Sequence, residues 1–331
     1  MDVGAWFNKR TLRHQDFGNI PKLLELKKKQ KLSVSVCLPT LNTAGTLDFI
    51  LRVLTDILVK EYPLIDEIAV IDGRSTDATV KIAEKYGVAV YYDDEWFADL
   101  PAASGKGDAL WRSIYHLKGD IIAWLDSDIK NIHPRFVYGP IGALLADRTI
   151  GYVKGFYERP ITQDGVSKPS GGGRVTELVT RPIFNLWYPE LAGLIQPLSG
   201  EYAGRREVLE SVPFVTGYGV ETALLIDTLV EFGLDSIAQV NLEARIHANQ
   251  SLPALGRMSF GVLQTAFMRL DRDKKVKMRE RYETTLNVIK HTGGDYSIEP
   301  REIEVIERPP MKTRPEYQKK RKGKKPKWPS A

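Results

Sequence analysis

Apolar runs and helical patterns alternate along residues 32–125 of the chain. The run Ile121–Leu125 is wholly apolar, which indicates a strand buried on both faces. Similar runs predict further strands at Leu32–Leu38, Glu67–Ile71 and Val88–Tyr92. Helical periodicity between them predicts helices over Thr46–Val59, Thr76–Tyr86 and Asp108–Leu117. Because strands that alternate with helices form βαβ units, we expect an α/β fold with a mainly parallel sheet flanked by helices.

The second half of the chain is less regular. Strands are predicted at Gly151–Arg159 and Leu234–Asn241, and a polar, glycine-rich loop at Thr162–Gly173. Helical patterns cover Arg174–Trp187, Val220–Phe232 and most of Ala254–Lys290. A short amphipathic helix over Lys22–Lys29 is expected before the first strand.

These patterns predict one main domain with additions at both ends. We expect an N-terminal helical arm over residues 1–31 and the main domain over residues 32–250, with halves of about 32–130 and 131–250. A helical extension over residues 251–309 and a basic, disordered tail over residues 310–331 should follow.

Composition narrows the class of protein. Apolar residues make up 43% and charged residues 27% of the 331 positions, which are ordinary values for a globular protein. No run approaches 18 apolar residues, and the N-terminus lacks a hydrophobic leader, so we expect a cytoplasmic protein without a membrane partner. The single Cys37 lies in an apolar run and is expected to be a buried structural thiol.

The positive charge is concentrated at the C-terminus. Residues 310–331 hold nine Lys and Arg against one Glu, a net charge of +8, so the remaining chain is about −3 when the whole chain is +5. A basic tail on a slightly acidic body is not a basic binding face, which argues against nucleic acid as the partner.

The tripeptide Asp126-Ser127-Asp128 directly follows the apolar run at Ile121–Leu125. Its two carboxylates should therefore emerge at the carboxyl end of a strand, the edge where open α/β sheets bind ligands. Two carboxylates this close ionise readily only near a cation, which points to a divalent metal that holds a nucleotide diphosphate. An acidic turn after a core strand is the alternative explanation.

Two further loops are expected at the same edge. They are Pro39-Thr40-Leu41-Asn42-Thr43, after the first strand, and Asp72-Gly73-Arg74-Ser75-Thr76-Asp77, after the second. Asp72 could accept a hydrogen bond from a base or ribose. Ser75, Thr76 and Asp77 are residue types that cap helices, and for them we favour a structural role.

Gly105-Lys106-Gly107 precedes a predicted helix. Glycines allow the backbone to approach a phosphate, and a helix N-terminus favours an anion. The spacing of a Walker A loop is absent, and a flexible turn with an exposed lysine is the alternative.

Together these loops resemble the nucleotide-sugar half of a GT-A glycosyltransferase. Later segments resemble the glucosyl-3-phosphoglycerate synthases and the related mannosyl-3-phosphoglycerate synthases, namely Gly171–Leu178, Gln196–Tyr202, Gly217–Glu221 and Arg245–Asn249. The resemblance covers about Leu32 to Leu270 and implies a GT-A fold, a metal-dependent transfer with retained anomeric configuration, and a homodimer.

The resemblance also implies roles for individual residues. Asp128 and His247 would ligate Mg²⁺ or Mn²⁺, and Asp126 and Ser127 would hold ribose and phosphate. Lys106 would offset charge on the leaving diphosphate. The remaining donor contacts would come from Pro39, Thr40, Leu41, Asn42, Thr43, Asp72, Gly73, Tyr218, Gly219, Val220, Glu221 and Arg245.

The acceptor would need its own anion site. Backbone N–H groups at a helix start, a guanidinium and a hydroxyl can supply one, and the residues implied are Gly173, Arg174, Val175, Thr176 and Asn249. A loop that merely caps a helix is the alternative. For Glu221, we favour positioning of the donor sugar over attack on it as a nucleophile.

The expected reaction transfers glucose from UDP-glucose to the 2-hydroxyl of 3-phospho-D-glycerate. Two departures from the family pattern, Asn42-Thr43-Ala44 and Gly73-Arg74, fall where the nucleoside is read. They leave GDP-mannose, alone or beside UDP-glucose, as an alternative donor. A sugar-phosphate nucleotidyltransferase is a more distant alternative, and a non-enzymatic protein that binds partners through its basic tail is the weakest.

Overall fold

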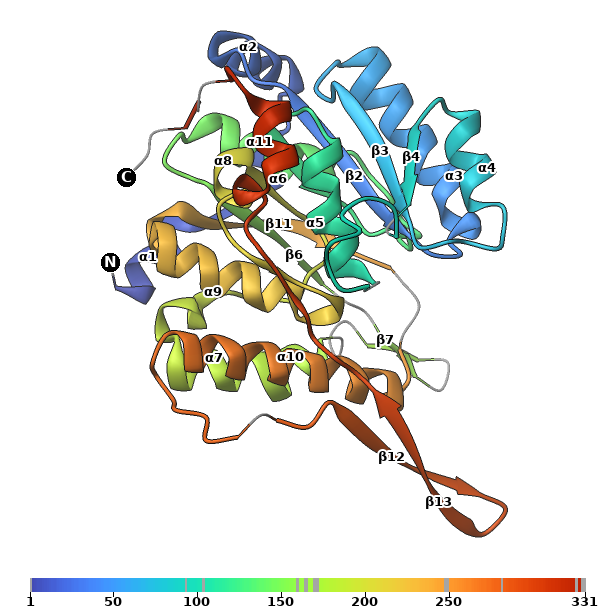
Figure 1. Cartoon of the computed structure of the whole chain (residues 1–331). Coiled ribbons are helices and arrows are strands. Elements are labelled where there is room, and N and C mark those ends of the chain that lie inside the picture. Colours follow the sequence, from blue (N-terminus) through green and yellow to red (C-terminus); the bar gives the residue numbers. More distant parts are fainter. Residues whose placement is uncertain are drawn as a thin grey trace.

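The computed structural model describes residues 2–92, 94–102, 105–158, 161–163, 166–168, 173–246, 250–280, 282–324 and 327–328. Its centre is an eight-stranded sheet in the order β1-β11-β6-β9-β5-β2-β3-β4 (Figure 1). The strands, in that order, are Thr11–Arg13, Ile237–Ala244, Tyr152–Glu158, Tyr202–Arg205, Ile121–Trp124, Val34–Thr40, Glu67–Asp72 and Ala89–Tyr92. Only β9 runs antiparallel to its neighbours, β5 and β6, so the prediction of a mainly parallel sheet is confirmed.

Alternate residues of the strands face two separate cores. Val34, Val36 and Leu38 of β2 lie in one core, and Cys37 lies in the other. This is the period of two that a pleated strand imposes. Burial raises the pKa of the Cys37 thiol to about 12, so it stays protonated, as expected of a structural thiol.

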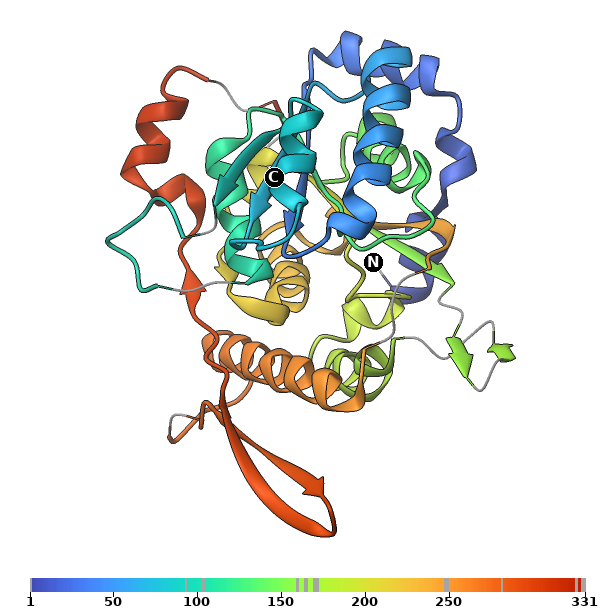
Figure 2. The same cartoon turned by 90° about the vertical axis from the view of Figure 1, so that its right-hand side faces the viewer.

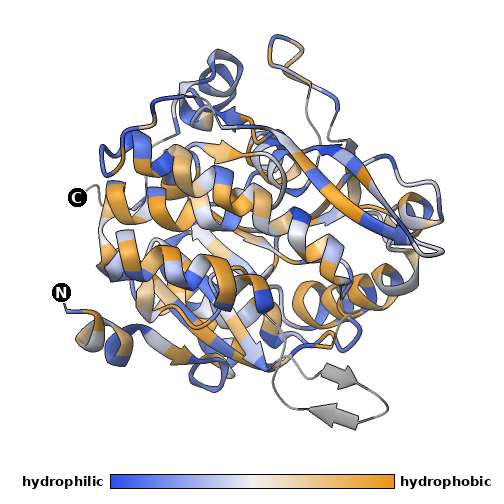
Figure 3. Cartoon of the chain, turned by 90° about the horizontal axis from the view of Figure 1, so that it is seen from below, coloured by the Kyte–Doolittle hydropathy of each residue, from blue (hydrophilic) through white to orange (hydrophobic). Residues whose placement is uncertain are grey.

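Helices cover both faces of the sheet. The first core is closed by helices α2 (Ile20–Gln30), α3 (Ala44–Val53, continued by the π-helical segment η2 at Leu54–Glu61) and α6 (Arg135–Ala146). The second is closed by α1 (Val3–Arg10), α5 (Lys106–His116), α7 (Arg181–Trp187), α9 (Val220–Phe232) and α10 (Leu252–Arg272). Seen from below, the helices on this side of the molecule carry hydrophobic residues interspersed with hydrophilic ones (Figure 3).

Shorter elements connect these layers. They are the helices α4 (Thr79–Lys85) and α8 (Arg206–Leu209), the strands β7 (Ile161–Gln163), β8 (Val166–Lys168) and β10 (Phe214–Val215), and the single turns η1 (His14–Phe17), η3 (Thr176–Thr180), η4 (Pro189–Gly193), η5 (Gly217–Gly219) and η6 (Leu234–Ser236).

Helix α6 and strand β9 were not predicted. In α6, every residue from Phe136 to Leu145 is buried, so the segment has no polar face and no amphipathic period. Its glycines allow close packing, because a Cβ at Gly142 would lie 2.5 Å from the Cβ of Phe17. Strand β9 has only four residues and includes Gly204, which weakens the strand signal in the sequence.

The N-terminal segment is part of the main fold rather than an arm before it. Strand β1 pairs in parallel with β11 and forms one edge of the sheet. The buried Trp6 donates from its indole N–H to the carbonyls of Leu234 (3.1 Å) and Ile237 (2.9 Å). The predicted division at residue 31 therefore separates residues that share one core.

The prediction of a largely helical segment up to Lys290 is wrong beyond α10. Strands β12 (Thr285–Thr292) and β13 (Asp295–Glu302) form an antiparallel hairpin that projects from the body of the molecule (Figure 1, Figure 2). The turn between them is Gly293-Gly294, with φ values of 62° and 95°. Two adjacent residues with positive φ favour a two-residue hairpin turn. The spacing of charged residues, on which the helix prediction was based, does not indicate this turn.

The C-terminal segment is ordered where the structure describes it, contrary to the prediction of a disordered tail. Strand β14 (Glu307–Arg308) pairs with β10, and η7 (Met311–Thr313) and α11 (Pro315–Arg321) follow. Tyr317 of α11 is 3% exposed. Its hydroxyl donates to the Glu210 carboxylate (2.5 Å) and accepts from Arg206 (3.0 Å). One aromatic anchor therefore fixes a helix whose composition resembles that of a solvated tail.

We expect Tyr317→Ala to destabilise the protein by about 3 kcal/mol, because it removes a buried ring and leaves hydrogen-bonding partners unpaired. Chemical denaturation would measure the free energy of unfolding. Lys319→Ala, at an exposed position of the same helix, is the control and should change it by less than about 0.5 kcal/mol. An equally small effect of Tyr317→Ala would show that this segment does not belong to the cooperative fold.

Candidate active site

The carboxyl end of β5 meets the N-termini of two helices. Lys106 is the first residue of α5, and Glu221 is the second residue of α9. The Lys106 ammonium lies 2.7 Å from an Asp126 carboxylate oxygen and 2.8 Å from one of Glu221. Burial disfavours the charged ammonium, but the two carboxylates outweigh it and hold the pKa of Lys106 above its ordinary value. The predicted catalytic residues Lys106 and Glu221 are thus brought together with Asp126.

Two glycine positions allow this meeting of helices. Gly105 and Gly217 both have positive φ, at 96° and 70°. A Cβ at Gly105 would lie 3.6 Å from the Cα of Gly217, so the loops before α5 and α9 are in contact. Between Gly217 and α9, Tyr218 is 53% exposed, and its ring is accessible to a ligand. Val220 is buried in the core, so its predicted donor contact is limited to its backbone.

Arg245, just beyond β11, is a second cation for the carboxylate pair. Its Nη2 lies 3.1 Å from Asp126 and 2.5 Å from Asp128. Its Nη1 donates to the Tyr157 hydroxyl (3.1 Å), and its Nε lies 3.3 Å from the buried Glu201. The buried guanidinium therefore binds both carboxylates from the interior of the protein and fixes their position.

Asp128 is the carboxylate best placed to take a metal, because its side chain is 49% exposed at this edge of the sheet. Within the described residues, no group of three or more His, Cys, Asp or Glu side chains forms a complete metal shell. An open carboxylate site fits Mg²⁺ or Mn²⁺ that takes its other ligands from a diphosphate. The predicted second ligand, His247, lies outside the described residues.

Hydrogen bonds connect the loop after β2 with the loop after β3, and they give Asp72 a role other than the one predicted. Asp72 is 0% exposed and accepts hydrogen bonds from Thr40 (2.8 Å) and from the backbone and hydroxyl of Ser75 (2.7 and 2.6 Å). Its side chain holds the loops together and offers no surface to a base or ribose, contrary to the expectation. Asn42 also connects the two loops, since its side chain accepts from Thr76 N–H (2.8 Å).

The other residues predicted to contact the donor fall into two groups, those that hold the loops in place and those that are exposed to a ligand. Ser127 is buried, and its hydroxyl donates to the Pro39 carbonyl (2.8 Å), so it also positions a loop. Leu41 and Asn42 are exposed, and Thr43 is partly exposed at the start of α3. Gly73 N–H donates to the Thr40 carbonyl (2.9 Å). The exposed loop tip therefore remains available to a nucleoside.

The predicted acceptor loop contacts Gln250, which lies just before α10. Arg174 is exposed, and its Nη2 donates to the Gln250 carbonyl (3.0 Å). Gly173 has a φ of 82°, whereas Val175 and Thr176 are buried. Among the described residues of this loop, Arg174 therefore has the exposed side chain that can face an anion. Asn249, the remaining predicted acceptor contact, is outside the described residues.

Sequence reasoning missed a group of residues beneath the carboxylates. Gly200 packs directly on Asp126, because a Cβ at position 200 would lie 1.8 Å from an Asp126 carboxylate oxygen. Glu201, Tyr202 and Lys154 are buried in the same region. The segment Gln196–Tyr202 stands out in the sequence only through the family resemblance, and Lys154 gives no signal within an apolar strand.

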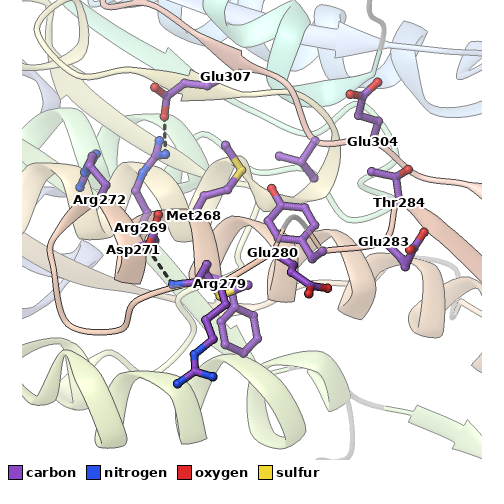
Figure 4. Close-up of a pocket in the computed structure, with 14 residues that line it drawn as sticks. Met268, Arg269, Asp271, Arg272, Arg279, Glu280, Glu283, Thr284, Glu304 and Glu307 are labelled. Carbon is purple, nitrogen blue, oxygen red and sulfur yellow. Dashed lines mark hydrogen bonds and ion pairs between the residues drawn. The ribbon is translucent and has the colours of Figure 1, made fainter.

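A cavity of about 670 Å³ lies elsewhere, between α10 and the segments that flank the hairpin (Figure 4). Its lining combines Arg269, Arg272 and Arg279 with several glutamates and none of the residues discussed above. Arg269 and Arg272 are paired with Asp227.

An α/β sheet with paired carboxylates, a buried lysine and a helix N-terminus at its carboxyl edge defines a site for a nucleotide diphosphate. The profile of glycosyl transferase family 2 matches residues 35–207. The glucosyl-3-phosphoglycerate synthase of Petrotoga mobilis is 49% identical over 94% of this chain and 96% of its own length. The one from Mycobacterium tuberculosis is 41% identical, with 85% of both chains covered.

Solved structures agree with this assignment. Mannosyl-3-phosphoglycerate synthase from Rubrobacter xylanophilus has a TM-score of 0.86 and 35% identity, with 94% of this chain and 98% of that chain covered. Glucosyl-3-phosphoglycerate synthase from M. tuberculosis, in complex with Mn²⁺, UDP and glucosyl-3-phosphoglycerate, has a TM-score of 0.77 and 40% identity, with 89% and 95% covered. This chain belongs to glycosyl transferase family 2 and, within it, to the glucosyl-3-phosphoglycerate synthase family. It has the GT-A fold and is a nucleotide-sugar-dependent glycosyltransferase.

None of the helices in the described part of the chain combines the length and the apolar character needed to cross a lipid bilayer.

We expect Gly200→Ala to weaken the binding of UDP in the presence of Mn²⁺ by about tenfold or more, because the added methyl group must displace the Asp126 carboxylate. Isothermal titration calorimetry would measure the affinity, and thermal melting would verify the fold. Gly256→Ala, in α10 where a Cβ meets nothing within 4 Å, is the matched control. Equal affinities of the two variants would mean that the position of Asp126 does not matter for the nucleotide.

Proposed function

We propose that this chain transfers glucose from UDP-glucose to the 2-hydroxyl of 3-phospho-D-glycerate, with retention of the anomeric configuration. The observation that carries the proposal is the juxtaposition of Asp126, Asp128, Lys106 and Glu221 at one sheet edge. Solved structures of the M. tuberculosis relative with UDP-glucose, phosphoglyceric acid and Mn²⁺ support this choice of donor and acceptor.

Each charged group has a distinct part in the reaction. Mg²⁺ or Mn²⁺, held by Asp128 and by His247, would neutralise the diphosphate. Lys106 faces the same region and stabilises negative charge as the sugar–phosphate bond breaks. The acceptor oxygen bonds to the anomeric carbon, and its proton passes to the departing diphosphate. This front-face transfer requires no nucleophile from the protein.

The surroundings of Glu221 support its positioning role. One of its oxygens is bound by Lys106 at 2.8 Å and lies 3.5 Å from the Tyr202 hydroxyl. A carboxylate already engaged by an ammonium is a poor nucleophile, but it can still accept a hydrogen bond from a sugar hydroxyl. Its place at the N-terminus of α9 further stabilises its negative charge.

GDP-mannose is the second candidate donor. The mannosyl-3-phosphoglycerate synthase structure has the higher TM-score of the two compared, 0.86 against 0.77. The departures from the family pattern also lie in the exposed nucleoside loops. There, Arg74 has a φ of 63° and stacks over Tyr92, with its guanidinium carbon 3.9 Å from the ring centre. The other proposals, a homodimer and a cytoplasmic location, follow from the family resemblance and the sequence.

We expect product from UDP-glucose with 3-phosphoglycerate and Mg²⁺, and much less from GDP-glucose or GDP-mannose. Chromatography of parallel incubations would measure product formation. Addition of EDTA should abolish it, and Mn²⁺ or Mg²⁺ in excess should restore it. Product from GDP-mannose alone would establish the second candidate, and full activity in EDTA would remove the metal from the mechanism.

We expect Arg174→Ala to raise the KM for 3-phosphoglycerate roughly tenfold to hundredfold, because a charge-assisted hydrogen bond to the phosphate or carboxylate is lost. The KM for UDP-glucose should change little. Steady-state kinetics with each substrate varied in turn would separate the two effects. Arg52→Ala, an exposed arginine on α3, is the control. An unchanged KM for 3-phosphoglycerate would place the acceptor site elsewhere.

A further inference from the structure

Lys154 is a buried lysine outside the set of residues predicted to touch substrate. It lies in β6, is 1% exposed, and donates from Nζ to the Ser199 carbonyl at 2.6 Å. The ammonium also lies over the Tyr202 ring, 4.0 Å from its centre. An ammonium is costly to bury, so its retention beneath an active site calls for a reason beyond packing.

The segment Ser199–Tyr202, to which Lys154 binds, contacts the charged groups of the transfer site. Gly200 packs on the Asp126 carboxylate, and Glu201 lies 3.3 Å from Arg245. The Tyr202 hydroxyl lies 3.5 Å from Glu221. Successive residues of one short segment therefore set the positions of three functional side chains.

Lys154 contacts this segment at its first and last residues. Its hydrogen bond fixes the carbonyl of Ser199, immediately before Gly200, and its cation–π contact fixes the ring of Tyr202. An apolar side chain of similar length could fill the same space, but it would provide neither contact.

The charges around Lys154 show why it differs from an ordinary buried lysine. Burial is the main cause that lowers the pKa of Lys154, to about 7, and the like charge of Lys106 adds to it. Glu221, Glu201 and Asp126 act in the opposite direction. The groups that face it thus come from α5, α9, the end of β5 and the start of β9, where Tyr202 lies.

We infer that Lys154 is a positioning residue of the transfer site, which holds the Ser199–Tyr202 segment so that Asp126, Arg245 and Glu221 keep their reactive geometry. This inference rests on the proposed function and adds to it a residue that touches neither substrate. Because the lysine acts through the segment, its loss should lower the rate of transfer more than the binding of either substrate.

The test replaces Lys154 with methionine, which keeps the length of the side chain but removes its charge and its hydrogen bond. We expect kcat for UDP-glucose and 3-phosphoglycerate to fall roughly tenfold to hundredfold, while both KM values stay within about threefold of the wild type. The melting temperature should not fall, because an apolar side chain in place of a buried charge is often neutral or stabilising.

Lys27→Met is the matched control, since Lys27 is also buried and donates to two backbone carbonyls and to Asp66, but lies in α2 against the other core. It should lower the melting temperature and leave the kcat of the folded enzyme unchanged. A merely structural Lys154 would behave like Lys27.

The pH dependence of the free energy of unfolding provides a second test. The folded-state pKa of Lys154 is lowered, so folded protein releases this proton near pH 7, whereas the unfolded chain keeps it until about pH 10.5. Below pH 7, both states hold the proton and the penalty of the buried charge is fully present. The stability of the wild type relative to Lys154→Met should therefore rise from pH 7 toward pH 10.

The outcomes separate the two proposals. A wild type that makes no product from UDP-glucose and 3-phosphoglycerate overturns the proposed function. An active wild type with an unchanged kcat in Lys154→Met overturns the inference alone, as does a loss of kcat explained by a loss of folded protein. If Lys154→Met does not fold, Lys154→Leu, which likewise removes the charge and the hydrogen bond, is measured in the same way and judged by the same outcomes.

Discussion

The compensation of charge on Asp126 is the constraint on which the rest of the site depends. Its carboxylate lies between the Lys106 ammonium and the Arg245 guanidinium, at 2.7 and 3.1 Å. Without these cations, two carboxylates one residue apart would repel each other at the end of a buried strand. With them, Asp126 is fixed, and Asp128 is left about half exposed as the more accessible carboxylate of the pair.

Three distant parts of the chain must converge to provide that compensation. Lys106 depends on the contact between Gly105 and Gly217, and Arg245 depends on the parallel pairing of β11 with β6. The antiparallel strand β9 supplies the third contact. Because β9 runs antiparallel between β5 and β6, the segment before it lies beside the carboxyl end of β5, and Gly200 meets Asp126. A parallel strand would begin at the opposite edge of the sheet.

Several polar residues at the same edge have a different task from the one their sequence positions predict. Asp72 is the last residue of β3 and Ser127 follows β5, positions where ligand-binding residues often lie, yet both are buried and hold neighbouring loops. A rigid loop frame lets the exposed residues of the first loop face a ligand without a large loss of entropy on binding. Position after a strand thus predicts proximity to the site but not contact with the ligand.

The sequence by itself determined the βαβ alternation, the edge of the sheet that carries the site and the family, because periodicity and contiguous motifs are local properties. It could not reveal α6, which is apolar on all sides, or β9, which is too short to give a signal. The basic composition of the C-terminal segment also predicted a disordered tail. The segment is ordered because a buried tyrosine binds Arg206 and Glu210, which are close to it only in the folded protein. The pairing of Asp126 with both Lys106 and Arg245, and the place of Lys154, were decided by tertiary structure alone. Charge compensation and burial depend on residues that are far apart in the chain.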